Sequence, residues 1–314
     1  MSGLLLDERG VMKPRQLPPH LRGRPFSVEE ALAAGETPGR LRSRDLATPY
    51  HGARAPAEAR TTLERCRAFA PLLREGQALS HSTAAELWEL PVPPGPRQAA
   101  TIHVTATLGR EPRRPGIIGH REKNLPITIA HGLPIVEPIH AFIQCAALLP
   151  LDDLVAMGDA LVGRWSSFDE ACQQPRARVE EAVRDFTGGR GSRRLSAAMA
   201  LVRVGCWSPQ ETALRLLLQR AGLPEPELNS ACCDGLGRFL GRPDIVYRWA
   251  RVAVEYEGDH HRTDADVFQQ DIERRERFAD AGWRTIRVTK ADLYSRPEEV
   301  VARVKRALGR RVSN

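Results

Sequence analysis

The amino-acid sequence predicts a mixed α/β fold, with an α-β-β-β-α-β succession in its C-terminal third. Helical periodicity with capping residues occurs at 208–222, at 264–281 and from Pro297 onward. Between these helices, four short segments have the alternation and the flanking turns of strands: LGRFLG, DIVYRWA, RVAVEYE and WRTIRVT. The middle of the chain mixes helical and strand patterns in the same way.

The length of 314 residues allows more than one domain. We expect an N-terminal arm with a helix-turn-helix-like element at 1–60 and a mixed α+β domain at 61–175. A third domain is expected at 176–314, with its core at about 208–308. The basic stretch GGRGSRR, at 188–194, is expected to be a solvent loop.

A DNA-facing element is one interpretation of the N-terminal region. Ser27 caps a helix that ends at Gly35, and a turn at 37–39 leads into the basic segment RLRSRDL. If this segment is a recognition helix, Arg40 and Arg42 contact nucleic acid. Two ordinary surface helices are an equally good interpretation.

The overall composition is permissive of nucleic acid. The net charge is +7, and lysine occurs only at positions 13, 123, 290 and 305, so arginine carries most of the positive charge. Arginine suits phosphate recognition because its guanidinium forms bidentate hydrogen bonds. No long apolar run or secretory pattern occurs, and the six cysteines lack C-x-x-C pairs, so we expect a cytoplasmic protein with reduced thiols.

The histidines of the middle region suggest no metal site by their spacing. They are dispersed, without a ligand pattern such as H-x-x-x-H, and are expected to be core or surface residues. They are His81, His103, His120, His131 and His140.

Acidic residues dominate two neighbouring strand segments near the C-terminus. Asp244 is followed, after ten residues, by Glu255 and Glu257, which alternate with apolar residues in RVAVEYE and therefore share one face. An all-oxygen cluster of this kind suits Mg²⁺ or Mn²⁺. The alternative is a solvated acidic face that discourages edge pairing.

RPDIV, VAVEYEGDHHR, QDIERRERFADAGW and WRTIRVT together resemble the very-short-patch-repair (Vsr-like) branch of the PD-(D/E)xK nuclease superfamily. The similarity is greatest to the bacterial group called domain of unknown function 559. The resemblance implies a Mg²⁺- or Mn²⁺-dependent DNA endonuclease with Asp244 and Glu255 as metal ligands. Glu257 occupies the place where many members have a lysine, so the positive charge expected there is missing.

The resemblance also assigns roles to three further residues. His261 matches a histidine that would transfer a proton near the metal. Glu211 matches an acidic residue that completes the cluster, but a capping box with Ser208 explains it equally well. Arg274 would hold a phosphate or a carboxylate, with pairing to Asp271 on the same helix as the structural alternative.

SHSTAAELW and GLPIVEPIHAF, in the N-terminal half, resemble AbiEi-type antitoxins and transcriptional regulators. This resemblance implies a second function: a non-catalytic DNA-binding regulator that retains a nuclease fold. DNA is the partner in both cases. Whether a homodimer is needed to cut both strands is left open by the sequence.

Overall fold

The computed structural model describes residues 4–6, 12–93, 95, 101–164, 166–258 and 265–309. The chain forms two units, Met1–Cys145 and Ala146–Asn314, each of which is described by itself. Both combine helices with sheets, which confirms the mixed α/β fold. The division differs from the expected three parts, because the helices that follow residue 146 belong to the C-terminal unit.

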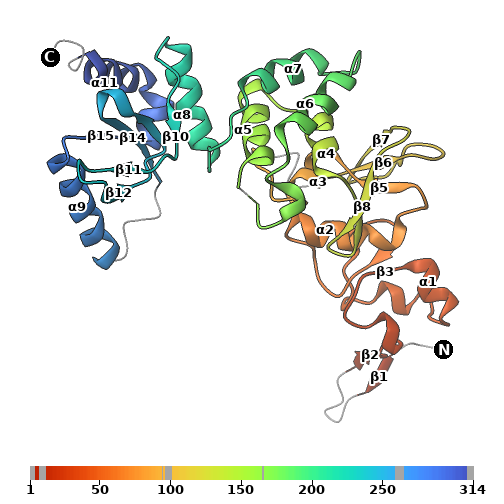
Figure 1. Ribbon diagram of the computed structural model, residues 1–314. Helices are drawn as coiled ribbons and strands as arrows, with labels where there is room; N and C mark the ends of the chain where they lie inside the picture. Colours follow the sequence, from red (N-terminus) through yellow and green to blue (C-terminus); the bar gives the residue numbers. More distant parts are fainter. Residues whose placement is uncertain are drawn as a thin grey trace. The chain divides into compact units, whose positions relative to one another are not determined.

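The first unit is organised around a five-stranded sheet with the order β7-β6-β5-β9-β8 (Figure 1). Its elements are β1 (Leu4–Leu6), β2 (Met12–Pro14), β3 (Phe26–Ser27), α1 (Val28–Ala33), β4 (Ala53–Arg54), α2 (Thr62–Phe69), β5 (Gln77–Leu79), α3 (His81–Leu87), β6 (Ile102–Ala106), β7 (Ile117–Arg121), β8 (Ile127–Ala130), β9 (Leu133–Val136) and α4 (Pro138–Cys145).

Strand β6 is the buried centre of this sheet. It pairs antiparallel with β5 and parallel with β7, and each of its five residues is buried. Helices α2 and α3 both contact it. Trp88, directly after α3, donates its indole N–H to the Val136 carbonyl at 2.8 Å, which ties α3 to β9.

The expected recognition helix is not formed. RLRSRDL contributes only the 3₁₀ turn Arg40–Arg42 after α1. Arg40 is 4% exposed and holds Asp45 in a bidentate pair, with N–O distances of 3.0 and 2.8 Å. Its guanidinium therefore stabilises the local turn, and the prediction that Arg40 contacts nucleic acid is wrong. Arg42 is exposed.

The second unit begins with a helical layer and continues into a mixed sheet. Its elements are α5 (Leu151–Val162), α6 (Arg176–Asp185), α7 (Ser192–Leu201), α8 (Pro209–Arg220), β10 (Glu227–Leu228), β11 (Cys232–Cys233), β12 (Phe239–Gly241), β13 (Ile245–Tyr247), β14 (Val252–Glu257), α9 (Ala265–Asp280), β15 (Arg284–Thr289), α10 (Lys290–Ser295) and α11 (Pro297–Gly309).

The basic stretch GGRGSRR is partly helical, so the expected solvent loop is wrong for its second half. Helix α7 starts directly after Gly191, whose φ of 93° lies in the left-handed region that glycine adopts freely. A Cβ there would meet the Ala146 carbonyl oxygen at 2.5 Å. Arg194 donates to the carbonyls of Ala146 and Leu149 at 3.1 and 2.9 Å, so its side chain is anchored to the segment that precedes α5.

The mixed sheet has the strand order β10-β13-β14-β15. Strands β13 and β14 are antiparallel, while β14 and β15 are parallel and are connected through α9. The expected strand LGRFLG forms β12, but β12 pairs with β11 in a separate ribbon. The edge position of the sheet is taken by the short strand β10.

Strand alternation gives the sheet two buried faces (Figure 1). Val252 and Val254 point into a core formed with α8, α10 and α11. Ala253 points to the opposite face, where α9 and the β11-β12 ribbon supply Phe278 and Cys232. Trp283 also packs there and is 8% exposed.

A buried ion pair joins the helical layer to α8. Asp159 on α5 is 0% exposed and accepts hydrogen bonds from Arg215 Nη2 and Thr212 Oγ1, both at 2.8 Å, and from the Arg203 backbone N–H at 2.7 Å. Arg215 is itself 1% exposed. The carboxylate is thus fully used by partners from the segments around it.

None of the helices in the described ranges is long and apolar enough to cross a bilayer. All six cysteines are free thiols, as the sequence predicts.

Arg215→Ala is expected to lower the free energy of unfolding of the second unit by about 3–5 kcal/mol, because it leaves the Asp159 charge buried without its partner. Arg220→Ala is the matched control, since Arg220 pairs with Asp152 on the same two helices but both side chains are about half exposed. It should cost no more than about 1 kcal/mol. Urea unfolding, with hydrogen exchange of the α5 and α8 peptides, measures both. Equal losses in the two variants would contradict this role of the buried pair.

Candidate functional site

The predicted carboxylates lie where β13 begins and β14 ends. Ile245 pairs with Val254, so Asp244, one residue earlier, stands opposite Glu255, one residue later, in the antiparallel register. Cross-strand neighbours share a face, and this face is the one that carries Val246 and Ala253 toward α9. The two acidic side chains therefore meet on one side of the sheet.

Asp244 is fixed by backbone contacts on both sides. Its Oδ2 accepts the Tyr256 backbone N–H at 2.6 Å, and its carbonyl accepts the Asn229 N–H at 3.0 Å. Burial raises the pKa of Asp244 to about 7, and the negative charges of Glu211 and Glu255 add to this increase. The site thus concentrates more negative charge than its own hydrogen bonds neutralise.

Glu211 takes part in both of the arrangements that the sequence left open. Its backbone N–H donates to the Ser208 hydroxyl at 3.0 Å, as in a helix cap. Its carboxylate accepts from the Trp207 backbone N–H at 2.8 Å and from the Asn229 amide at 2.7 Å. Glu211 therefore caps α8. Its negative charge also acts on Asp244, so it belongs to the acidic cluster as well.

Arg274 forms an ion pair with Glu255, while the side chain of Asp271, its alternative partner, lies outside the described residues. Its Nη2 forms a salt bridge with Glu255 Oε1, and both side chains are largely buried. The guanidinium also lies 5.4 Å from the centre of the Phe278 ring. A Cβ at Gly241 would meet Arg274 Nε at 2.7 Å, so the glycine leaves room for this arginine.

Glu257 lies two residues beyond Glu255 on the same face of β14. It forms a 3.2 Å salt bridge with Arg287, which stands opposite Glu255 on β15. Glu257 therefore has an arginine of the next strand as its partner.

The donor set suits a hard divalent cation, since it consists of carboxylate oxygens next to one another. Within the described ranges, however, no three of these carboxylates offer oxygens that all lie within 4.8 Å of one another. Glu255 and Glu257 are held by arginines. Binding of Mg²⁺ or Mn²⁺ would require Glu255 to exchange Arg274 for the ion.

His261 lies outside the described residues.

A different group of ligands is brought together in the first unit: one nitrogen each of His81, His103 and His120, all within 4.8 Å of one another. It is the one such group in the described part of the chain. The sequence interpretation of these three histidines as unrelated core or surface residues did not anticipate their proximity.

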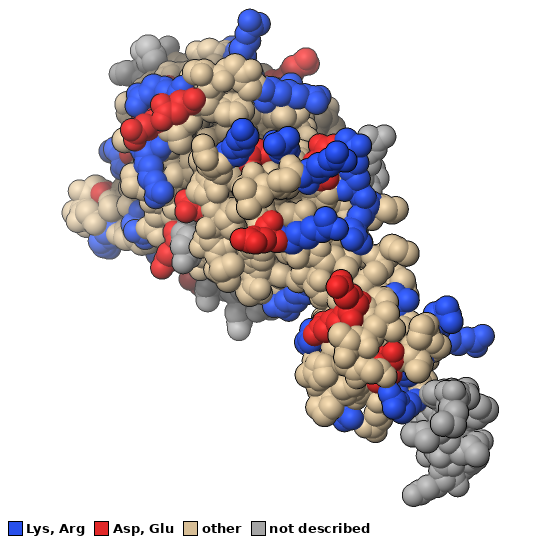
Figure 2. Space-filling view, turned by 90° about the vertical axis from the view of Figure 1, so that its right-hand side faces the viewer, with Lys and Arg blue, Asp and Glu red and all other residues tan. Residues whose placement is uncertain are grey.

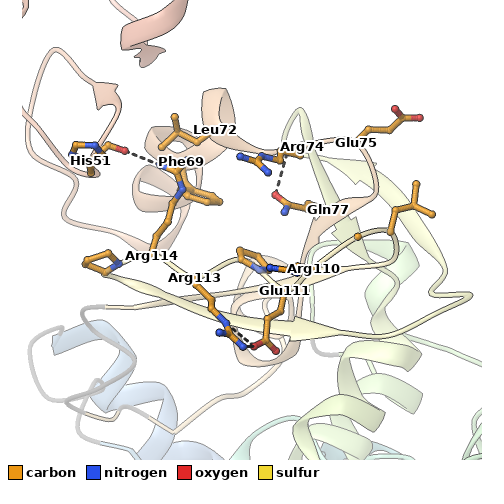
Figure 3. A pocket seen from close by; sticks show the side chains of 14 residues that line it. His51, Phe69, Leu72, Arg74, Glu75, Gln77, Arg110, Glu111, Arg113 and Arg114 are labelled. Carbon is orange, nitrogen blue, oxygen red and sulfur yellow. Dashed lines mark hydrogen bonds and ion pairs between the residues drawn. The ribbon is translucent and has the colours of Figure 1, made fainter.

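A second candidate site is an arginine-lined pocket of about 1040 Å³ in the first unit (Figure 3). Arg113 pairs with Glu111, and Arg114 donates to the His51 carbonyl at 2.9 Å. Arg74 and Arg110 are exposed, and neither side chain has an ion-pair partner among the described residues. The lining holds four arginines and two glutamates, Glu75 and Glu111, so the pocket offers a net positive charge to an anion.

Basic side chains are otherwise interspersed with acidic ones on the face drawn in Figure 2. The net positive charge is thus not gathered into one continuous basic surface there. Local arrangements such as the arginine-lined pocket carry the case for anion binding.

Asp244→Asn is expected to stabilise the metal-free protein at pH 8 by on the order of 2 kcal/mol. Below about pH 4 the Asp244 carboxyl is protonated in both the folded and the unfolded protein. Between about pH 4 and about pH 7 it is ionised only in the unfolded protein. Wild-type stability therefore falls over this interval and is level above it, so the advantage of the variant grows from pH 4 to 7.

Urea unfolding in EDTA at pH 5 and pH 8 measures this difference. Asp234→Asn is a suitable control, because hydrogen bonds from the Arg238 and Leu236 backbone and from the Arg238 side chain lower the pKa of Asp234. A stability gain for Asp244→Asn that is the same at both pH values would contradict the charge argument.

Comparison with known proteins finds two similar proteins of Mycobacterium tuberculosis. They are "Uncharacterized protein MT2308" of strain CDC 1551 / Oshkosh and "Uncharacterized protein Rv2248" of strain ATCC 25618 / H37Rv. Each is 29% identical over 136 residues, which is 43% of this chain and 49% of the relative. The chain therefore spans about half the length of the curated relatives it matches. No family model matches the chain, and no solved structure does.

Proposed function

We propose that the second unit is a metal-dependent endonuclease that hydrolyses phosphodiester bonds in DNA, with Asp244 and Glu255 at its centre. The observation that carries the proposal is that Asp244 and Glu255 share one face of a mixed sheet while the negative charge of Glu211, at the start of α8, acts on Asp244. Burying like charges together is costly, and a divalent cation is the ligand that relieves the cost. Mg²⁺ or Mn²⁺ would be the cofactor and DNA the partner.

The residues of the chain would have distinct roles in this reaction. Asp244 and Glu255 would hold the ion, with Glu211 adding negative charge behind Asp244. When bound, Mg²⁺ lowers the pKa of water and stabilises charge on the phosphate. Arg274, released from Glu255, would be free to donate to a phosphate oxygen. Arg287, paired with Glu257, supports the proposal by supplying a positive charge near the position of the missing lysine.

A second function, a non-catalytic DNA-binding regulator, is favoured by the same ion pairs. Glu255 and Glu257 are already compensated by Arg274 and Arg287, so the sheet is stable without a metal. DNA would then meet the arginine-lined pocket of the first unit. The endonuclease remains the preferred proposal because neither Asp244 nor Glu211 forms a salt bridge with an arginine among the described residues.

Asp244→Asn and Glu255→Gln are each expected to reduce nicking of supercoiled DNA in Mg²⁺ or Mn²⁺ by at least about 100-fold, because each replaces a charged carboxylate ligand of the ion with a neutral amide. The full chain is assayed on agarose gels, with EDTA abolishing the reaction. Glu227→Gln is the matched control: Glu227 lies in the same sheet and pairs with Arg248, away from the cluster.

Nicking that persists in Asp244→Asn and Glu255→Gln would exclude this site. A wild-type chain that binds DNA without nicking it under any of these conditions would support the regulator. Size-exclusion chromatography of the same preparation tests whether the chain forms the homodimer that cutting both strands would call for.

The double variant Arg74→Glu and Arg110→Glu is expected to weaken DNA binding and to reduce the slope of log K against log salt by about 2, one phosphate contact for each arginine. Fluorescence anisotropy at several salt concentrations measures the slope. Arg44→Glu changes an exposed arginine of the same unit outside the pocket and should leave the slope nearly unchanged. An unchanged slope in the double variant would remove the pocket from the DNA interface.

A further inference from the structure

Three histidines meet inside the first unit. His81 begins α3, His103 lies on β6 and His120 lies on β7. His103 Nδ1 is 2.9 Å from His120 Nε2, and the rings of His81 and His120 stack with centroids 3.6 Å apart. One ring nitrogen from each histidine lies within 4.8 Å of the other two. They are called the histidine cluster below.

The sheet register brings two of these side chains together. Thr105 pairs with His120 in the parallel β6-β7 ladder, and His103 stands two residues before Thr105. Alternation puts His103 and Thr105 on the same face of β6, and their cross-strand neighbour His120 shares that face. Two adjacent strands therefore present both imidazoles to one place.

The third histidine is held there by its backbone. The His81 N–H donates to the Gln144 side chain at 3.0 Å, and the Gln144 amide donates to Glu122 at 2.6 Å. His81 has a φ of 53°, in the left-handed region that a non-glycine residue rarely adopts. Such strain persists where surrounding contacts enforce it, and functional sites are common places for it.

The cluster is buried and rich in lone pairs. His81 is 8% and His103 5% exposed, and burial lowers the pKa of His81 to about 2 and of His103 to about 4. Burial also lowers the pKa of His120. Three imidazole nitrogens, atoms that commonly bind metal ions, thus lie within 4.8 Å of one another in a space largely closed to solvent.

Thr105 supplies an independent observation. Its hydroxyl is 0% exposed, and Oγ1 has no hydrogen-bond partner among the described residues. A buried hydroxyl without a partner costs about 1–3 kcal/mol. It lies on the face that carries His103 and His120, so a water bound to an ion between the histidines would satisfy it.

We propose that His81, His103 and His120 bind one Zn²⁺ ion, with the fourth coordination position directed toward the Thr105 hydroxyl. Three imidazoles suit zinc, and three protein ligands with an open position are the pattern of zinc sites that bind water or a small ligand. Zn–N bonds of about 2.0–2.1 Å place tetrahedral ligand nitrogens roughly 3.3 Å apart. Binding therefore breaks the His103–His120 hydrogen bond and turns the His81 ring out of its stack.

This site is separate from the proposed nuclease site, since all its residues belong to the first unit. Its existence does not depend on DNA cleavage. Metal binding is therefore the readout, not activity.

The test uses the full chain, stripped of metal with EDTA, exchanged into metal-free buffer and titrated with Zn²⁺ or with Co²⁺ as a spectroscopic probe. His103→Gln and His120→Gln should each bind one equivalent fewer than the wild type, or bind it more weakly by over about 100-fold, which exceeds the effect of outer-shell partners. His140→Gln is the matched control, a half-buried histidine of α4 outside the cluster. It should retain the ion.

Circular dichroism of the metal-free variants establishes that they fold. Should the glutamine variants fail to fold, ¹H–¹⁵N spectra of the wild-type imidazoles, recorded with and without one equivalent of Zn²⁺, give the same answer without a substitution. Three ring nitrogens of the cluster are expected to shift together. Equal zinc stoichiometry and affinity in the wild type and both variants would overturn the proposal, as would wild-type spectra in which these nitrogens do not respond.

Discussion

The register of the β13-β14-β15 ladder determines the rest of the second unit. Ile245 pairs with Val254, and Val254 with Ile286, so the apolar residues of three strands enter one core together. The same register places Asp244, Glu255 and Arg287 side by side, and all three lie on the face of the sheet opposite to this core. A slip of one residue would exchange these faces and bury the glutamates in the apolar core, so packing and site geometry are set by one constraint.

Charge compensation is uneven around this site. Arg274 and Arg287 neutralise the two glutamates of β14, whereas Asp244 is left between Glu211 and Glu255 with a raised pKa. These ion pairs compensate the glutamates without an ion, and the uncompensated Asp244 is what supports the proposed cation. That balance is why a nuclease and a DNA-binding regulator are both chemically consistent with it, and why Arg274, shared between a carboxylate and a prospective phosphate, is its pivotal residue.

Local signals in the sequence were sufficient for many helices and strands. Ser208 and Glu211 mark the start of α8, and the alternation of RVAVEYE marks β14, because capping and period-2 burial depend on near neighbours. Other expectations failed where distant contacts decide. RLRSRDL forms only a 3₁₀ turn since Arg40 is held by Asp45 and the Arg15 carbonyl, and the end of GGRGSRR becomes helical where Arg194 reaches Ala146.

The sequence by itself determined the mixed α/β fold, the position of most elements of the second unit and the shared face of Glu255 and Glu257. Only the tertiary structure decided which groups meet: Arg274 with Glu255, Glu211 with Asn229, and His81 with His103 and His120. The physical reason is the distance along the chain over which each kind of interaction acts. Periodicity and capping act within a few residues, whereas these contacts arise from strand register and helix placement between segments far apart in the chain.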